Sequence, residues 1–364
     1  MLCSFAGGAG HLVPQVPLHR ALARAGHRLT LVGRQSAARA APAEIYTRIV
    51  ARADQRNQLT STIAPLAPAD IEHELAVIGH HFAGDAALKA AAAARDELAE
   101  SDLVVCDEVD FGVIAAAQKA GIPVVVVSVI ASGALVRPER LTSALEDLGQ
   151  KLGAAEAIRP RGDFFVIPFA PAMRDPRFAA PADALFMRPD PGPVPRTDGS
   201  LVATLGTEFN TESGDLFDRI LSALAIVRTP ATVAIGRNLV PTRFGPQPSH
   251  VRVEQYVDFD AVIPRASVVL HHGGSGLFVR SVLGGAAQIV FPMGADQPFT
   301  ADRVHDMNLG QALDPLTATP AAIAEAITNL RTDERVSSNV ETLRLSTLAL
   351  PDPATIVKHL EGAI

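Results

Sequence analysis

Apolar runs without polar alternation are the feature that most constrains the fold of this chain. Residues 122–130 form a nearly continuous series of β-branched side chains, and the predicted strand 102–107 has an apolar centre at 103–106. A strand that is apolar on both sides is covered on both faces, as parallel strands between two helical layers are. A helical pattern over 111–120 supplies the crossover that two parallel strands require. The sequence therefore predicts an α/β fold with parallel sheets.

The alternation of strands and helices occurs twice along the 364 residues. It begins with strand patterns at 2–5 and 28–33 that enclose a helical pattern, and it restarts at 201–205. Between the two series, residues 188–199 contain four prolines, which prevents a packed element and predicts a semi-rigid linker. The predicted parts are a first domain, a proline-rich linker, a second domain and a C-terminal helix: 1–190, 191–199, 200–350 and 351–364.

One segment of the first domain gives a weaker pattern. Residues 39–99 are rich in alanine, and we predict mostly helix there, with breaks at Pro65 and Pro68. No chemistry is assigned to this segment from its pattern.

Composition excludes several classes of protein. With 48% hydrophobic residues the chain can form packed cores, and its net charge of −7 offers no positive field for nucleic acid. The uncharged apolar stretch 121–136 is shorter than the roughly 20 residues of a membrane helix, so we expect no stable membrane insertion. Cys3 and Cys106 both lie in apolar runs and are predicted to be core thiols. Together with an N-terminus that lacks a basic region, they favour a cytoplasmic location.

The first candidate loop follows the first predicted strand, at the sheet edge where open parallel sheets bind ligands. Residues 6–11 are rich in glycine, which lets a backbone approach a ligand closely, and they end on His11. A histidine has a near-neutral pKa and suits the role of general base. The alternative interpretation is that His11 only caps the loop.

The same loop also matches part of a dinucleotide-binding fingerprint. Gly8 and Gly10 fit its first half, but Val13 stands at the third glycine position. Arg34, at the end of the next strand, would then favour NADP over NAD. An NADP-dependent reductase is therefore retained as one alternative function.

The second candidate loop is acidic. Residues 107–110 follow a predicted strand and contain Asp107, Glu108 and Asp110. A carboxylate there could reach a histidine on the first loop and hold its tautomer. The alternatives are a solvated turn, or an N-cap made by Asp110 for the helix that follows.

The third candidate site combines two loops of the second domain. Residues 271–276 place two histidines and three glycines before a helix, an arrangement that suits a phosphate or diphosphate. Neighbouring strand side chains point to opposite faces, so the two histidines form a poor metal pair. Asp296 and Gln297 follow another predicted strand and could bind sugar hydroxyls, or form an ordinary Asx turn. The Asp-x-Asp motif at 258–260 is interpreted as a turn, so no metal site is predicted.

Together these segments resemble a known family. Residues 268–276, continued by 288–298, closely resemble the donor-site signature of family 1 glycosyltransferases of the GT-B fold, of the bacterial natural-product type that glycosylates antibiotics, macrolides and other aglycones. Residues 5–14 resemble the start of the acceptor domain, and 202–207 the first strand and phosphate loop of the donor domain. The resemblance covers nearly the whole chain. It implies two facing Rossmann-like domains with a cleft between them, the first binding the acceptor and the second the donor.

The resemblance also implies a role for each matching residue. His11 would be the general base and Asp107 would orient it, while Gly10 and Phe82 would contact the acceptor. The donor would be held by one further set: Gly206, Thr207, Tyr256, Val257, His272, Gly273, Gly274, Ser275, Gly276, Asp296 and Gln297. The implied reaction is an inverting, metal-independent transfer of a sugar, a deoxysugar by preference, from a dTDP- or UDP-sugar to a hydroxyl of a small, largely apolar natural product. No tightly bound cofactor is implied.

Two departures from the family pattern keep another alternative open. Leu277 and Phe278 stand where the family has hydroxyl residues beside the phosphate, and Asp258 and Phe259 replace a Pro-Gln pair near the nucleobase. Both predict altered donor binding. A homologue without catalysis, acting as a nucleotide-sugar-binding or partner protein, is the alternative that they favour. The sequence leaves open a homodimer and an activating partner protein.

Overall fold

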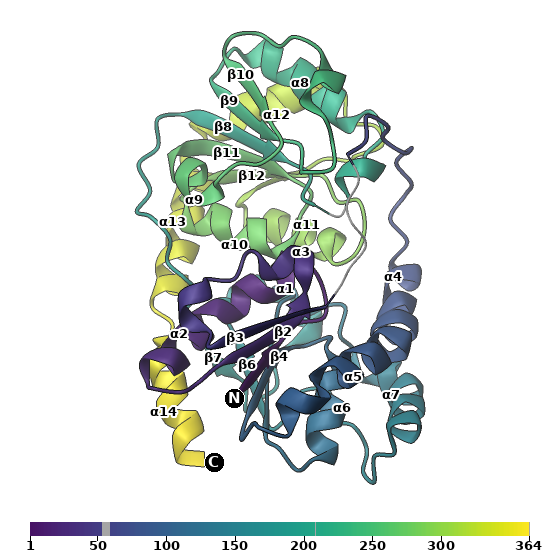
Figure 1. Cartoon of the computed structure of the whole chain (residues 1–364). Coiled ribbons are helices and arrows are strands. Elements are labelled where there is room, and N and C mark those ends of the chain that lie inside the picture. Colours follow the sequence, from purple (N-terminus) through teal and green to yellow (C-terminus); the bar gives the residue numbers. More distant parts are fainter. Residues whose placement is uncertain (53–58, 208, 364) are drawn as a thin grey trace. The chain divides into compact units, whose positions relative to one another are not determined.

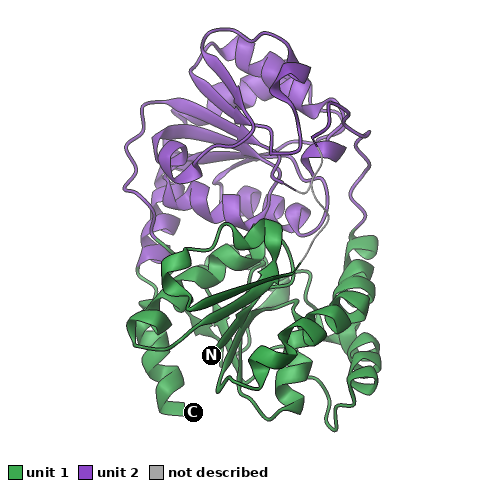
Figure 2. Cartoon of the chain, viewed as in Figure 1, with its two compact units in different colours: residues 1–56, 71–190, 349–364 green, residues 57–70, 191–348 purple. Residues whose placement is uncertain are grey.

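The computed structural model describes residues 1–52, 59–207 and 209–363 and divides the chain into two compact units (Figures 1 and 2). Unit 1 comprises Met1–Arg56, Ile71–Asp190 and Ala349–Ile364, and unit 2 comprises Asn57–Asp70 and Pro191–Leu348. Each unit is built on one fully parallel sheet, which confirms the predicted α/β class. Within the described residues, no helix has the length and apolar character needed to cross a lipid bilayer.

The sheet of unit 1 has seven strands in the order β3-β2-β1-β4-β5-β6-β7. Its order reverses between the neighbours β1 and β4, so the loops that leave these two strands diverge at a switch point, where open sheets bind ligands. The strand bounds are β1 Leu2–Ser4, β2 Thr30–Arg34, β3 Arg48–Arg52, β4 Val104–Asp107, β5 Val124–Val127, β6 Phe164–Ile167 and β7 Leu185–Phe186.

Helices cover both faces of this sheet (Figure 1). One layer holds α1 Ala9–Leu12, the 3-10 turn Val13–Gln15, α2 Val16–Arg24 and α14 Pro353–Ala363, and the other holds α4 Ile71–Val77, the π-helix Ile78–Asp85, α5 Ala86–Leu98, α6 Phe111–Lys119 and α7 Pro138–Leu152. The short elements are α3 Gln35–Ala38 and the 3-10 turns Ala43–Ile45, Pro171–Met173 and Pro176–Phe178.

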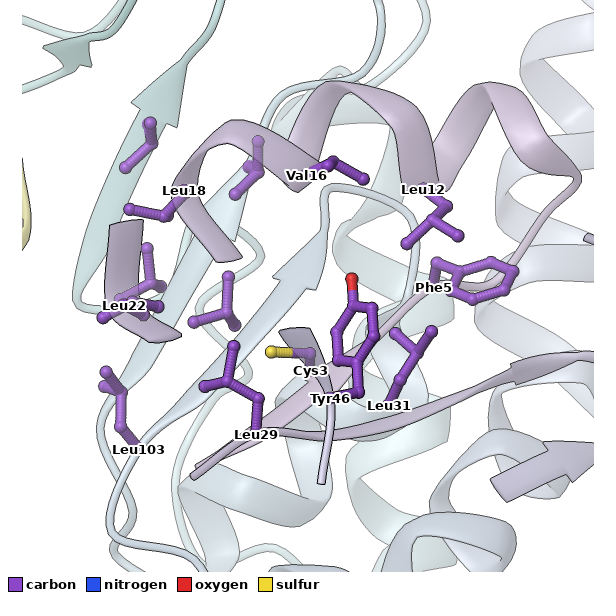
Figure 3. Packing of buried hydrophobic residues seen from close by; sticks show 14 of the residues in the cluster. Cys3, Phe5, Leu12, Val16, Leu18, Leu22, Leu29, Leu31, Tyr46 and Leu103 are labelled. Atoms are coloured by element: carbon purple, nitrogen blue, oxygen red, sulfur yellow. The ribbon is translucent and has the colours of Figure 1, made fainter. Parts of the chain in front are cut away.

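The core of unit 1 fills the space between sheet and helices. Leu12 and Val16 of the helical layer point toward Cys3 and Leu31 of the strands (Figure 3). Ile356, on the C-terminal helix α14, belongs to the same cluster, and α14 packs on α2. Cys3 and Cys106 are buried free thiols, as predicted for core residues.

The sheet of unit 2 has six strands in the order β10-β9-β8-β11-β12-β13, with the order reversed between β8 and β11. Its strands are β8 Ser200–Thr204, β9 Ala231–Ala234, β10 Val251–Glu254, β11 Ala266–His271, β12 Ala287–Val290 and β13 Gly310–Ala312. Its helices are α8 Leu216–Val227, α9 Phe259–Val262, α10 Ser275–Leu283, α11 Gln297–Asp306, α12 Pro320–Thr332 and α13 Glu334–Leu348, with 3-10 turns at Asn210–Glu212, Pro241–Phe244 and Ile263–Arg265.

The segment 39–99 differs from two predictions, one for its secondary structure and one for its domain. It contains β3, an edge strand whose side chains are largely exposed, so no buried apolar run marks it in the sequence. Its residues 57–70 also belong to unit 2, although they were predicted within the first domain. The backbone N–H of Thr60 donates to Asn238 O at 2.7 Å, and that of Ala64 donates to Thr211 O at 2.7 Å.

Candidate active site

His11 lies beside a buried carboxylate at the switch point of unit 1. Its Nδ1 is 3.4 Å from Asp107 Oδ2, and the exposed fractions of the two side chains are 26% and 0%. His11 is the third residue of α1, which begins at Ala9, so the predicted loop is shorter than expected. The two residues proposed as base and orienting acid are thus adjacent in space, although 96 positions separate them in the chain (107 − 11).

Asp107 is held by backbone donors from two loops. Its Oδ2 accepts from Ala6 N at 2.7 Å, and its Oδ1 accepts from Val109 N at 2.8 Å. Hydrogen bonds of this kind stabilise an ionised carboxylate in a buried place. They also fix the direction in which the carboxylate faces the imidazole.

A glycine provides the space that the His11 ring occupies. A methyl group at Gly7 would lie 2.2 Å from the Cδ2 atom and 2.3 Å from the Nε2 atom of His11. Gln15 fixes the backbone beneath the ring, because its Nε2 donates to His11 O at 2.8 Å and to Ser4 O at 3.1 Å. The glycine-rich loop therefore has a steric role that the sequence pattern alone does not specify.

Phe82 packs on the imidazole of His11. Their ring centroids are 6.1 Å apart with an interplanar angle of 19°, and His81 meets Phe82 edge-on at 5.2 Å. Phe82 projects from the π-helix Ile78–Asp85, a helix type that often marks functional sites. Its assignment to the acceptor side stays a prediction, as does that of Gly10, which is exposed in α1.

Asp110 does not have the capping role that was one of its alternatives. It occupies the N-cap position of α6, but its side chain makes no capping hydrogen bond. Its Oδ2 instead accepts from Ser4 Oγ at 2.7 Å. Glu108 is likewise buried, and its Oε1 accepts from Val129 N at 2.7 Å and Ile130 N at 2.8 Å.

Asp110 and Glu108 make two separate sets of buried hydrogen bonds that the sequence did not specify. Burial raises the pKa of Glu108 above its ordinary value, and burial together with Asp107 raises that of Asp110 to about 6. Three acids within four residues were the only sequence signal for these buried bonds.

The two histidines of unit 2 have different environments. His271 is buried in β11, where its Nδ1 accepts from Gly273 N at 3.1 Å, which leaves Nε2 to donate to Gln288 Oε1 at 2.9 Å. Burial lowers the pKa of His271 to about 4. His271 is therefore a neutral structural residue that holds the glycine loop. Both of its ring nitrogens are occupied by protein partners.

The His272 ring lies close to the backbone of two glycines, Gly206 and Gly274. Methyl groups at Gly206 and Gly274 would lie 2.6 Å from its Cε1 and Nε2 atoms, respectively. Its Nδ1 is buried without a hydrogen-bond partner among the described residues, and Phe209 packs at 6.4 Å. Burial, with a smaller contribution from His271, lowers the pKa of His272 to about 3, so the ring is neutral at pH 7. A neutral imidazole can still donate one hydrogen bond.

The glycine loop ends at the N-terminus of α10. Gly274 is the N-cap residue in an extended conformation, and Gly273 has φ +98°, a backbone conformation that L side chains rarely adopt. Ser275 and Gly276 then begin the helix, whose first backbone N–H groups have no helical acceptor. Such a helix end favours an anion.

Asp296 and Gln297 lie beside this helix end. Ser275 Oγ donates to Asp296 Oδ2 at 2.8 Å, so the first residue of α10 and the carboxylate are linked. Gln297 Oε1 accepts from Met293 N at 2.8 Å and Gly294 N at 3.2 Å, which fixes the loop after β12. Of the two, Asp296 has the larger exposed surface. Their assignment to sugar hydroxyls stays a prediction.

The residues proposed around the nucleotide lie in different environments. Tyr256 is 64% exposed, and the Arg237 guanidinium lies 4.6 Å from its ring centroid, whereas Val257 is buried. Gly206 N is 3.3 Å from Thr204 Oγ1, and Thr207 is exposed beside it. These roles also stay predictions.

The residues that depart from the family pattern lie in two environments: Leu277 and Phe278 are buried, and Asp258 is exposed. Phe278 is fully buried and Leu277 is 9% exposed in the core of unit 2, so both side chains are packing residues. Asp258 caps α9 by accepting from Asp260 N at 3.1 Å, as expected for a turn. Among the described residues, no group of His, Cys, Asp and Glu side chains could hold a metal ion.

Comparisons with known proteins match part of the sequence and the overall fold. Residues 219–363 match the family described as "Erythromycin biosynthesis protein CIII-like, C-terminal domain". The 10-deoxymethynolide desosaminyltransferase of Streptomyces venezuelae is 32% identical over 114 residues, which are 31% of this chain and 27% of that protein. The L-demethylnoviosyl transferase of Streptomyces niveus is 28% identical and covers 97% of this chain and 95% of its own length.

A solved structure matches the whole fold. The spinosyn rhamnosyltransferase SpnG, complexed with thymidine diphosphate, has a TM-score of 0.75 at 17% identity, covering 99% of both chains. The first domain match and the first relative concern only part of the chain, while the fold match extends over all of it. Its C-terminal part is thus similar to the erythromycin biosynthesis protein CIII-like family, and its fold is the GT-B fold of glycosyltransferases of known structure.

Proposed function

We propose that this protein transfers a sugar from a nucleotide diphosphate sugar to a hydroxyl group of a small, largely apolar natural product. The observation that carries the proposal is the His11 imidazole, partly exposed and 3.4 Å from the buried carboxylate of Asp107. Relatives named as a desosaminyltransferase and a demethylnoviosyl transferase support a deoxysugar, and a structural neighbour complexed with thymidine diphosphate supports a dTDP donor over a UDP donor.

In unit 1, the proposed chemistry begins with a proton transfer. The acceptor O–H gives its proton to His11 Nε2, while Nδ1–H faces Asp107, which stabilises the imidazolium that forms. The electron pair of the acceptor oxygen forms a new bond to the anomeric carbon. A single displacement of this kind inverts the configuration at that carbon.

In unit 2, the proposed chemistry is the stabilisation of the leaving group. The bond from the anomeric carbon to the diphosphate breaks, and its electron pair stays on the phosphate oxygen. The N-terminus of α10 and the neutral His272 donate hydrogen bonds to this growing negative charge. Asp296 and Gln297 bind the hydroxyls of the sugar. No metal ion is required in this mechanism.

The proposal is tested by isothermal titration with dTDP and UDP, followed by a transfer assay with dTDP-deoxysugars and a panel of hydroxylated apolar acceptors. His11→Ala should reduce transfer by roughly 10²–10⁴-fold, the usual contribution of general base catalysis. His27→Ala is the matched control, because His27 also pairs with a carboxylate, that of Glu361 at 2.8 Å, but on the surface. We expect the control to retain full activity.

Three outcomes would contradict the proposal. Undiminished transfer by His11→Ala would remove His11 from the mechanism. Nucleotide binding without transfer to any acceptor would support a partner protein that has lost catalysis. An increase in NADPH fluorescence on mixing would instead favour the reductase alternative.

A further inference from the structure

Asp110 is a buried carboxylate that the proposed mechanism does not use. It follows β4 and is 1% exposed. Its Oδ2 accepts from Ser4 Oγ on β1, whereas its Oδ1 is buried without a hydrogen-bond partner among the described residues. Its side chain makes no close capping hydrogen bond to α6, and the Val113 N–H is the single group of that helix that attracts its charge. An ordinary core residue would cost less to bury.

The groups that face Asp110 can be named element by element. β1 contributes the Ser4 hydroxyl, β4 contributes Asp107 and the Cys106 thiol, and β3 contributes the Arg52 guanidinium. From α6 only a backbone N–H, that of Val113, interacts with it. Arg52 also donates to Phe5 O at 2.7 Å, so its position is fixed by the first loop.

Asp107 and Asp110 lie in one buried turn, where the backbone N–H of Asp110 donates to Asp107 O at 3.1 Å. Asp107 is stabilised as a carboxylate by two backbone N–H donors and by His11. Asp110 has one hydroxyl donor and the electrostatic attraction of Arg52. Burial, and next the charge of Asp107, raise the pKa of Asp110 to about 6, so its charge changes in the range where a histidine also titrates.

We propose that Asp110 is a positioning residue that acts through Asp107 and controls how firmly His11 holds a proton. When Asp110 is ionised, its negative charge adds to that of Asp107 and favours the imidazolium form of His11. When Asp110 is protonated, only the charge of Asp107 favours the imidazolium form of His11. The His11–Asp107 pair thereby becomes a group of three coupled sites, whose use in catalysis rests on the proposed function.

The test is a pH titration of the His11 imidazole, followed by NMR of ¹³Cε1-labelled histidine, with His11→Ala used to assign the signal. In Asp110→Asn we expect the midpoint of the His11 titration to fall by roughly 0.3–1 pH unit, because a nearby negative charge is removed. The wild type should titrate in two steps and the variant in one. Asp147→Asn, exposed on α7, is the matched control and should give the wild-type curve.

A second variant keeps the inference testable if Asp110→Asn does not fold. Ser4→Ala removes the hydroxyl that stabilises the Asp110 carboxylate. The step of the His11 titration that reports Asp110 should then move to higher pH. A His11 titration that is the same in wild type, Asp110→Asn and Ser4→Ala would overturn the inference, even if both variants melt at lower temperature, because a merely structural role predicts that result.

The outcome is distinguishable from failure of the proposed function. The titration requires no substrate, so it is informative even if no acceptor is turned over. Where transfer is observed, the acid limb of the kcat/KM profile should shift to lower pH in Asp110→Asn by the same amount as the His11 midpoint. An acid limb that does not shift would contradict the inference while leaving transferase activity established.

Discussion

At the scale of single residues, the site in unit 1 depends on how precisely one imidazole is held. His11 contacts a carboxylate through Nδ1 and an aromatic ring through its face, and it occupies space that a glycine leaves free. These contacts come from three separate parts of the chain. Each is therefore a place where a single substitution can displace the ring without removing it.

Gly7→Ala should displace His11. The added methyl group would lie 2.2 Å from the ring, which forces the imidazole away from Asp107. Because a displacement of about 1 Å can cost roughly 10²-fold in rate, we expect a loss of that order in transfer. Gly362→Ala on α14, where an added methyl group meets nothing within 4 Å, is the control for a glycine-to-alanine change. Equal activity of Gly7→Ala and wild type would contradict the steric role.

A second residue-scale prediction concerns stability and pH. His19 is buried and bonded to the Tyr46 hydroxyl at 2.8 Å, and burial lowers its pKa from 6.5 to about 3. Between these values the unfolded chain binds a proton that the folded chain does not, so this histidine stabilises the fold above pH 6.5. Its contribution is lost as pH falls, by about 1.4 kcal/mol per pH unit.

The measurement is urea unfolding at several pH values between 7.5 and 5. The raised pKa of Asp110 makes its contribution to the unfolding free energy fall as pH rises, opposite to that of His19. The effect of His19 is therefore measured by comparing a His19 variant with wild type. His19→Gln should lower the dependence of the unfolding free energy on pH relative to wild type. An identical pH dependence in both proteins would show that His19 is not neutral in the folded state.

At the scale of elements, the sequence predicted buried parts better than exposed ones. β4 and β5 were predicted because their apolar residues face helices on both sides, and both strands are fully buried. β3 was missed because its position at the sheet edge leaves it exposed and puts Arg48 and Arg52 at its two ends. The periodicity of apolar residues reveals a buried face, and an exposed strand has few apolar residues to show it.

The candidate site followed the same principle. The loops after β1 and β4 could be predicted as neighbours once the sheet was expected to be parallel, and His11 and Asp107 do meet there. The hydrogen bond between Ser4 and Asp110 could not be predicted, because it depends on the register of β1 and β4, which pairs Ser4 with Cys106. Register is set by tertiary packing that a pattern does not show.

The placement of 59–70 in unit 2 also depends on backbone contacts. Ala64 N donates to Thr211 O at 2.7 Å, and Ala64 O accepts from Gly214 N at 3.0 Å. Ala64→Pro removes the first of these donors, so we expect a loss of roughly 0.5–1.5 kcal/mol in the unfolding free energy. Ala67→Pro is the matched control three positions later. Equal stability of both variants would contradict the account of this segment.

At the scale of the whole molecule, the C-terminal helix ties the end of the chain to its beginning. Residues on α14 belong to the same core cluster as residues on α2, although unit 2 separates them in the sequence. Leu360 is 1% exposed in that cluster, so Leu360→Ala should cost about 2–5 kcal/mol of unfolding free energy. Lys358→Ala, at an exposed position of the same helix, should have little effect. Chemical denaturation of both variants tests this, and similar midpoints would show that α14 does not stabilise unit 1.

The whole-molecule account also divides the chemistry between the two units. Under the proposed function, unit 1 would supply the base His11 and the orienting acid Asp107, and unit 2 would supply the N-terminus of α10 and the neutral His272 for the diphosphate. Each unit places these groups after its β-strands by the same parallel topology. The proposed reaction requires both sets, so removal of either should abolish transfer while leaving the other unit folded.

The central claim is that His11 and Asp107 act as one catalytic unit. A double-mutant cycle in the transfer assay tests it most directly, with His11→Ala, Asp107→Asn and the two combined. Residues that act as a unit are strongly non-additive. We therefore predict that the double variant transfers sugar no more slowly than the slower single variant. Losses that multiply, so that the double variant is slower by the product of both single effects, would contradict the account.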